Sequence, residues 1–424
     1  MKENLLHFIW KLKLFPVKTL CTSQGEKLEI VSSGLPNFNA GPDFLTAKIR
    51  VNGQLWVGNV EIHVNASDWY AHGHENDKNY DAVILHVVWN DNMEIFRNSN
   101  KPLTTLALKK YVSKNVLDKY RKLMLKDEKW ILCENQLGTV SKFHLSNWLE
   151  KLYYERLEKK SKIITSLLAF NKNNWEATLF CLLAKNFGLK INGEAFFDMA
   201  KSINFSVIRK ISCNPFQLEA LLFGQAGLLI DQYESDYFKK LQNEYNYLKN
   251  KFKLQPVFKK QVDFFRLRPN NFPTIRLSQF ANLIYKEQHL FSKVLETKNI
   301  KNYYELLSVK TSAYWETHYT FGKSSKKTIK KTSKKFIDLL VINTIIPLKF
   351  IYHKHNGNLS LMSNVIDMAT DMKPEKNAIL SKFESLQVAS NNLFESQALL
   401  ELKNEYCNNQ KCLQCAIGKE LITS

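Results

Sequence analysis

The sequence feature that most constrains the fold is a change of hydrophobic pattern in the N-terminal region. Residues 43–51 (DFLTAKIRV) and 54–64 (QLWVGNVEIHV) alternate polar and apolar side chains around Asn52-Gly53, a pair that favours a two-residue hairpin turn. Residues 82–89 (AVILHVVW) are apolar almost throughout, which is typical of a central strand buried on both faces. These stretches predict a mixed sheet that contains a hairpin and an interior strand.

The remaining N-terminal segments supply the other elements of an α/β domain. Residues 1–15 (MKENLLHFIWKLKLF) predict an amphipathic helix, residues 27–34 a strand, and residues 66–81 a polar segment that is helical at least in part. The expected order is helix, three strands, helix, strand. We expect a helix on each face of the sheet, because connections in α/β units cross over it.

The pattern changes again beyond this domain. From residue 142 onward, apolar residues recur at three- and four-residue spacing, as in LSNWLEKLYYERLEKKSKII and DYFKKLQNEYNYLKNKFKL. We therefore expect an α+β N-terminal domain in residues 1–100, a connecting segment in 101–141, and a large all-α domain in 142–424.

The charge of the chain is divided unequally between these parts. The net charge is +20, yet residues 1–100 hold nine Lys and Arg against eleven Asp and Glu, which leaves 51 against 29 for residues 101–424. A basic region is the electrostatic footprint of a nucleic-acid-binding protein. The alternative is a compositional bias toward lysine, since the chain has 52 Lys and only eight Arg.

Two features bear on location. The apolar run at residues 336–352 is interrupted by polar residues and by proline and is shorter than the ~20 residues of a membrane helix, so no membrane span is expected. The chain has seven cysteines, an odd number, and residues 1–15 do not have the pattern of a secretory signal. Both observations favour the reducing cytoplasm.

Three polar residues on the predicted hairpin form the candidate catalytic site. Alternation places Glu61 and His63 on one face of their strand, and hairpin pairing brings Asp43 at the end of the preceding strand near them. Two carboxylates beside a nitrogen base can hold Mg²⁺ or Mn²⁺ and orient a water for phosphodiester hydrolysis, with Asp43 and Glu61 as ligands. The alternative is that Glu61 and His63 simply pair with each other or cap a solvated face.

The segment after the hairpin adds histidines to this candidate site. His72 and His74 do not share a helical face, so they can serve one site only from a loop, which Gly73 between them favours. We assign both to substrate contacts or to a supporting shell. His86 on the apolar strand is expected to be a hydrogen-bonded core histidine.

The arginines form a second candidate substrate contact. Three of the eight fall within RLRPNNFPTIRL, namely Arg266, Arg268 and Arg276. The prolines fix a loop before a helix that can begin at Thr274, and arginines near a helix N-terminus suit phosphate. The alternative is that they pair with acidic residues of the helical body.

The order of the elements and these motifs resemble the core of the PD-(D/E)XK nuclease superfamily. Pro42-Asp43 matches the PD, and Glu61-Ile62-His63 matches the (D/E)XK except that His63 stands in place of lysine. The whole chain also resembles an uncharacterised bacterial family, the domain of unknown function 2851. That likeness rests on NAGPDF, GNVEIHV, SDWYAHGH, YDAVILHVVW, EALLFGQAGLL, RPNNFPTIRL and the cysteine-bearing end.

The end of the chain contains a candidate metal site. Cys407, Cys412 and Cys415 form a C-x4-C-x2-C pattern, whose C-x2-C half is a geometry that holds a metal or cluster iron. Cys133 is the candidate for the fourth ligand of Zn²⁺ or of a [4Fe–4S] cluster. The layout of one cysteine on one side and three on the other resembles some nucleases of the superfamily. The alternative is a set of buried or free thiols.

Two functional classes follow. The first is a metal-dependent nuclease whose α/β core cuts DNA or RNA held by a basic helical domain. The second is a non-catalytic nucleic-acid-binding or scaffold protein that keeps the nuclease-like fold without its lysine. Nucleic acid is the expected partner in both classes, and the sequence does not indicate a protein partner.

Overall fold

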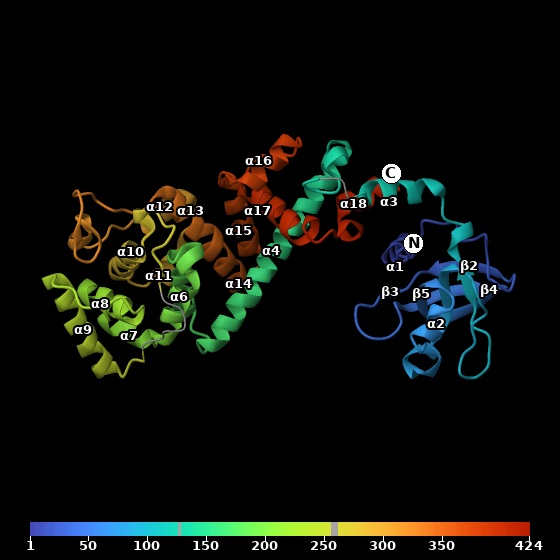
Figure 1. The fold of residues 1–424 in the computed structure, drawn as a ribbon, viewed down its shortest axis with the longest axis horizontal. Helices are drawn as coiled ribbons and strands as arrows, with labels where there is room; N and C mark the ends of the chain where they lie inside the picture. The colour runs from blue at the N-terminus through green and yellow to red at the C-terminus, as the bar shows by residue number, and fades with distance from the viewer. Residues whose placement is uncertain (126–128, 256–261) are drawn as a thin grey trace. The chain divides into compact units, whose positions relative to one another are not determined.

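The computed structural model describes residues 1–125, 129–255 and 262–424 (Figure 1). The chain divides into two compact units. Unit 1 consists of Met1–Leu149, Asn377–Ala389 and Leu399–Ser424, and unit 2 consists of Glu150–Lys376 and Ser390–Ala398. An N-terminal region with a mixed sheet is thus followed by a helical region, as the sequence predicts.

Among the described residues of unit 1, seven strands form one sheet in the order β1-β2-β4-β5-β6-β7, with β3 paired to β4. Strands from β1 to β5 pair antiparallel, whereas β5, β6 and β7 pair parallel, so the sheet is mixed. The strands are β1 (Leu20–Cys21), β2 (Lys27–Ser32), β3 (Leu35–Pro36), β4 (Phe44–Val51), β5 (Gln54–Asn65), β6 (Val83–Asn90) and β7 (Thr105–Ala107). The sequence did not predict β1, β3 and β7, each of which is only two or three residues long.

The hairpin between β4 and β5 has the predicted turn. Val51 pairs with Gln54, and the two residues between them have positive φ angles, 50° at Asn52 and 89° at Gly53. Turns with two positive φ angles match the twist of a hairpin and need Asn or Gly at these positions. The turn fixes the register of the hairpin from Val51 to Ala47, and a bulge between Ala47 and Phe44 shifts it by one residue at the start of β4.

A helix covers each face of the sheet, as expected. On one face, α1 (Glu3–Leu12) buries residues such as Leu6 and Trp10 in a core that includes Val60 and Ile62 of β5. On the other face, Trp69 of α2 (Asp68–Ala71) packs in a smaller cluster with residues that include Val83 and Val88 of β6. Strand alternation directs Glu61 and His63 toward this second face.

The end of the chain belongs to unit 1, which differs from the expected domain division at residues 100 and 141. Helix α18 (Ala416–Thr423) lies beside α3 (Lys114–Met124), as Figure 1 shows in red and teal. Ile422 of α18 is fully buried in the core that α1 forms on the sheet. Burial of these apolar side chains joins segments that are far apart in the sequence, which a local pattern does not reveal.

The remaining helices confirm the helical pattern beyond residue 142. The stretches quoted above become α4 and α9, and the described residues of unit 2 add a two-stranded sheet of β8 (His318–Thr320) and β9 (Lys323–Ser324). The helices are α4 (Lys142–Phe170), α5 (Trp175–Phe187), α6 (Leu189–Ser202), α7 (Phe205–Ile211), α8 (Pro215–Gln225), α9 (Asp236–Phe252), α10 (Pro273–Lys286), α11 (Leu290–Glu296), α12 (Ile300–Leu306), α13 (Lys334–Leu340), α14 (Ile346–His355), α15 (Leu359–Asp371), α16 (Ala378–Ser385) and α17 (Leu393–Glu401).

One helical run is longer than its interrupted sequence indicates. Residues Lys334–His355 are long and apolar enough to cross a membrane, and 72% of the apolar window is buried inside the structure. A π-helical segment, Val341–Ile345, precedes Pro347 and continues into α14. Such a segment changes the hydrogen-bond pattern locally, so the run proceeds through the proline. Burial of this extent is what a core helix of a globular unit shows.

We expect Gly58→Ala to destabilise unit 1. A Cβ added to Gly58 in β5 would lie 2.4 Å from Ile84 Cγ2 and 2.6 Å from the carbonyl oxygen of Ala82. The second contact is with backbone, so the two strands must separate locally. Overpacking of this kind lowers the free energy of unfolding by about 1–3 kcal/mol, which the urea midpoint measures.

Gly138→Ala is the matched control. Its added Cβ meets only Gln387 Oε1, at 3.5 Å, which is an ordinary contact. We expect its unfolding free energy to stay within about 0.5 kcal/mol of the wild type. Equal midpoints for the two variants would contradict the pairing of β5 and β6 at this point.

Candidate functional site

The candidate site begins where β4 starts beside β5. The backbone N–H of Asp43 donates a hydrogen bond of 3.1 Å to Glu61 Oε2, and the backbone N–H of Ile62 donates one of 3.0 Å to Asp43 Oδ2. Each carboxylate is thus bound by the backbone next to the other. The structure brings Asp43 and Glu61 together, as the hairpin predicts, and only 5% of Glu61 is exposed to solvent.

His63 lies on the same face of β5 and contacts two other histidines. Its Nδ1 is 2.8 Å from Nε2 of His86 on β6, and its Nε2 is 3.1 Å from Nδ1 of His72. His63 and His86 are both buried. His86 is therefore the hydrogen-bonded core histidine expected from the sequence, and its partner is a residue of the candidate site.

His72 and His74 reach the site from a tight bend after α2. The helix ends at Ala71, Gly73 adopts a φ of 71°, and a 3₁₀ turn begins at His74. This is the loop that Gly73 predicts, because a left-handed residue between the two histidines breaks the helical register. Tyr80 stacks on the His74 ring with centroids 3.8 Å apart, which fixes that ring in place.

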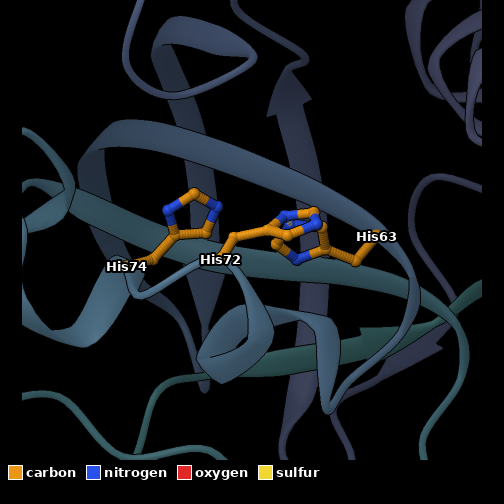
Figure 2. Close-up of side chains that lie close together, drawn as sticks. All are labelled: His63, His72 and His74. Carbon is orange, nitrogen blue, oxygen red and sulfur yellow. Dashed lines mark hydrogen bonds between the residues drawn. The ribbon is translucent and has the colours of Figure 1, made fainter.

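Three imidazoles, those of His63, His72 and His74, lie close together on this face of the sheet, as Figure 2 shows. One ligand atom from each of His63, His72 and His74 lies within 4.8 Å of the other two. Glu61 Oε1 is 3.5 Å from His63 Nε2 and 3.4 Å from His74 Nε2. His74 Nε2 is buried and has no hydrogen-bond partner among the described residues. A buried nitrogen without a partner is costly and points to an additional ligand.

The surroundings favour neutral forms of these groups. Burial and the neighbouring Asp43 raise the pKa of Glu61 to about 8. Burial, with the nearby His74 and His72, lowers the pKa of His63 to about 4, and burial also lowers the pKa of His74 and of His86. A neutral imidazole keeps a lone pair, which is the form that binds a metal.

Sequence reasoning missed two neighbours of the site. His7 of α1 places its Nε2 3.2 Å from Asp43 Oδ2, and Tyr80 packs against His74. No local pattern marks His7, because it comes from a helix that only tertiary packing brings to the start of β4. Trp69 is almost fully buried, and its ring centroid lies 5.4 Å from that of His74 and 5.5 Å from that of His86.

The three arginines of RLRPNNFPTIRL occupy different environments. Arg266 and Arg268 are exposed, whereas Arg276 is buried within α10. Arg276 Nη1 donates to Gln279 Oε1 at 2.9 Å, Nη2 donates to Asn271 Oδ1 at 2.6 Å, and the guanidinium carbon lies 3.6 Å from the centroid of the Phe336 ring. These contacts give Arg276 a packing role in unit 2.

The four cysteines of the predicted metal site line a single pocket of unit 1. Its walls include Cys133, Cys407, Cys412 and Cys415 together with apolar residues from three segments, namely Ile131, Leu137, Leu402 and Ile417. All four cysteines are free thiols. Gly418 allows this close packing, because an added Cβ would lie 2.1 Å from the carbonyl oxygen of Cys412.

The thiols are protonated in the absence of a cation. Burial and the neighbouring cysteines raise the pKa of Cys133 to about 12 and that of Cys412 to about 11, and burial raises those of Cys407 and Cys415 as well. Backbone N–H groups of Ile417 and Gly418 oppose this effect at Cys415, because they stabilise its thiolate. Thiolates are the form that binds metal, so a cation would have to displace these protons.

The fold and the site define a two-unit protein whose mixed-sheet unit carries a carboxylate–histidine cluster and, separately, a four-cysteine pocket. The chain belongs to the family described as "Protein of unknown function (DUF2851)", whose model matches residues 3–378. The match includes the carboxylate–histidine cluster and ends before the last three cysteines. No curated protein and no solved structure matches the chain.

We expect Arg276→Met to destabilise unit 2, since it removes two buried hydrogen bonds and the stacking on Phe336. The loss should be about 2 kcal/mol or more, measured as the free energy of unfolding. Arg268→Ala, which changes an exposed arginine of the same stretch, should stay within about 0.5 kcal/mol of the wild type. The packing role is wrong if Arg276→Met keeps full stability while nucleic-acid binding falls.

Proposed function

We propose that this protein is a metal-dependent phosphodiesterase that acts on nucleic acid. The observation that carries the proposal is the convergence of Asp43, Glu61 and His63 at the end of a buried strand pair, with their contacts of 3.0–3.5 Å. Carboxylates held in this way are the oxygen ligands that divalent cations take in hydrolases.

The topology supports the proposal. The order of α1, β2, β4, β5, α2 and β6, with three antiparallel strands followed by a parallel one, is the arrangement that the resemblance to PD-(D/E)XK nucleases implies. Asp43 begins the second of these strands, and Glu61 and His63 lie on the third, where that superfamily has its motif. The nuclease-like identity of the fold is part of the proposal.

The chain's own residues hold the reacting groups in place. The backbone N–H of Ile62 orients Asp43, whose Oδ2 also lies 3.2 Å from His7 Nε2, and the backbone N–H of Asp43 orients Glu61. A bound divalent cation would activate a water and neutralise charge on the phosphate. His63, adjacent to Glu61, is placed to accept a proton from that water, as a neutral imidazole can near pH 7.

The excess of basic residues after residue 100 supports nucleic acid as the substrate. Exposed cations such as Arg266 and Arg268 would contact phosphates without reading sequence. The alternative function is non-catalytic binding of nucleic acid. The observation that favours it is His63 in place of lysine, because a neutral imidazole does not supply the fixed charge that stabilises a phosphorane-like transition state.

We expect Asp43→Ala and Glu61→Ala to abolish cleavage while binding of nucleic acid persists, because these residues hold the cation and not the polymer. The rate should fall by a factor of about 100 or more. The assay uses single-stranded, double-stranded and branched DNA and RNA with Mg²⁺, Mn²⁺ or Zn²⁺, and binding is followed by fluorescence anisotropy.

His355→Ala is the matched control, since it removes an exposed histidine of unit 2. Cleavage that survives in Glu61→Ala would come from a contaminant. Binding without cleavage in the wild type, under every metal, would favour the non-catalytic alternative.

We further propose that Cys133, Cys407, Cys412 and Cys415 bind an iron–sulfur cluster that fastens the end of the chain to unit 1. A single Zn²⁺ ion holds its sulfurs about 3.8 Å apart, given Zn–S bonds of ~2.3 Å in a tetrahedron. Among the described residues, the ligand atoms that gather in a group of three within 4.8 Å belong to the histidines, and no three of the cysteine sulfurs form such a group. A cluster separates its cysteines further than one ion does, because iron and sulfide lie between them.

We expect Cys412→Ser to lower both the iron content and the melting temperature. Purified without oxygen, the wild type should contain about four iron atoms per chain, as one [4Fe–4S] cluster requires. The variant should retain less than half of that iron and melt several degrees lower, by about 2–4 °C for each kcal/mol lost.

Cys213→Ser serves as the control, because Cys213 is an exposed thiol of unit 2. This variant should change neither the iron content nor the melting temperature. One zinc per chain, without iron, would replace the cluster by a zinc site. Metal-free protein that is insensitive to chelators would remove the site altogether.

A further inference from the structure

We propose that His63, His72 and His74 are ligands of a late first-row divalent ion such as Zn²⁺ or Co²⁺, and that Glu61 lies at the edge of that site. The inference rests on the proposed function for the reaction that the ion serves, but the binding itself is tested separately. It reassigns His72 and His74, which the sequence pattern assigns to substrate contacts or a supporting shell, to the metal. It also makes His63 a metal ligand in place of the proton acceptor described above.

The spacing of the donors fits one small ion. Metal–nitrogen bonds of about 2.0–2.1 Å in a tetrahedron place two ligand atoms about 3.3 Å apart. His63 Nε2 and His72 Nδ1 are 3.1 Å apart, and Glu61 Oε1 is 3.5 Å from His63 Nε2 and 3.4 Å from His74 Nε2. The three imidazoles gather their ligand atoms within 4.8 Å.

A chain of hydrogen-bonded histidines explains only part of this arrangement. Such a chain links His86, His63 and His72 at 2.8 Å and 3.1 Å, although His86 Nδ1 also has no hydrogen-bond partner. It leaves His74 Nε2 buried without a hydrogen-bond partner, although Glu61 Oε1 is 3.4 Å away. Buried polar atoms without partners are rare, and a bound cation would satisfy the nitrogen and the carboxylate together.

The neighbours of the three histidines orient them as metal ligands are usually oriented. A ligating histidine commonly donates its other ring N–H to a fixed acceptor. His63 Nδ1 can donate to His86 Nε2, which leaves the His63 Nε2 lone pair directed toward His72. Tyr80 stacks on His74 from one side and Trp69 meets it edge-on, so that ring is also held.

The donor set selects the class of ion. Imidazole nitrogens suit zinc, cobalt, nickel and iron, whereas Mg²⁺ prefers oxygen ligands and retains several waters. Three imidazoles, from His63, His72 and His74, outnumber the one carboxylate that touches them, Glu61. The site is therefore expected to bind Co²⁺ or Zn²⁺ in the presence of a large excess of Mg²⁺.

The test is a Co²⁺ titration of the full-length protein after metal removal. It is run in the presence of about 10 mM Mg²⁺, an excess of the competing ion. Cobalt bound to imidazole and carboxylate gives weak visible bands, while cobalt bound to thiolates absorbs strongly in the near ultraviolet, so the histidine and cysteine sites are separated. We expect one equivalent of Co²⁺ to bind with the weak visible bands of imidazole and carboxylate ligands. His74→Ala and His72→Ala should each weaken the affinity for this Co²⁺ by a factor of about 100 or more, since even the loss of outer-shell partners costs 10–100-fold.

The controls separate a lost ligand from a lost fold. His355→Ala should bind as the wild type does. Circular dichroism and the urea midpoint of His74→Ala should match those of the wild type, and His72→Ala provides a second variant if that one misfolds. His63→Lys, which restores the residue of the resembled superfamily, should lose Co²⁺ binding.

The outcomes distinguish this inference from the proposed function. Cleavage driven by Mg²⁺, with Co²⁺ binding unchanged in His72→Ala and His74→Ala, would overturn the histidine site and leave the phosphodiesterase proposal standing. Histidine-dependent Co²⁺ or Zn²⁺ binding without cleavage of any nucleic acid would support the site and overturn the proposed activity. Unchanged binding in both alanine variants and in His63→Lys overturns the inference under any condition.

Discussion

The candidate site depends on two reciprocal hydrogen bonds between the ends of β4 and β5. Asp43 N–H binds Glu61 Oε2, and Ile62 N–H binds Asp43 Oδ2. These bonds orient two carboxylates that would otherwise repel each other, and they do so with backbone groups that the strand pairing already fixes. Charge-assisted bonds of this kind are stronger than neutral ones. The turn at Asn52 and Gly53 sets the register as far as Ala47, and a bulge between Ala47 and Phe44 then shifts it by one residue, so that Phe44 pairs with Val60. The turn and the bulge together therefore place the acidic half of the site.

The position of the histidines depends on a different constraint, the tight bend of the backbone after α2. His72 and His74 reach His63 only because Gly73 takes a left-handed conformation, with a φ of 71°. Their position is then maintained by aromatic packing, with Tyr80 stacked on His74. A hairpin and a bend, formed by separate local rules, thus meet over one face of the sheet. Unit 1 holds both in place through the core that α1 and α18 share.

Local sequence patterns predicted the parts of the fold that local rules control. The hairpin turn, the buried strand β6 and the amphipathic α1 follow from residue periodicity and turn chemistry. The contact of His7 with Asp43, and the assignment of α18 to unit 1, depend on tertiary packing between distant segments, so no local pattern marks them. Arg276 illustrates the same limit, because its sequence environment resembles a phosphate site while its side chain packs against Phe336.

In the nuclease superfamily that the chain resembles, a lysine stands at the position of His63, and this difference alters the charge of the proposed site. A lysine would bring a permanent positive charge beside Asp43 and Glu61, whereas burial keeps His63 neutral by lowering its pKa to about 4. Burial, followed by the negative charge of the neighbouring Asp43, raises the pKa of Glu61 to about 8. A divalent cation would oppose this shift, because it stabilises both carboxylates at once. The same residue that removes the lysine charge also contributes an imidazole to the cluster with His72 and His74. If the proposed metal site exists, the histidine that stands in place of the superfamily's lysine is also one of its ligands, and the proposed catalysis would depend on the ion.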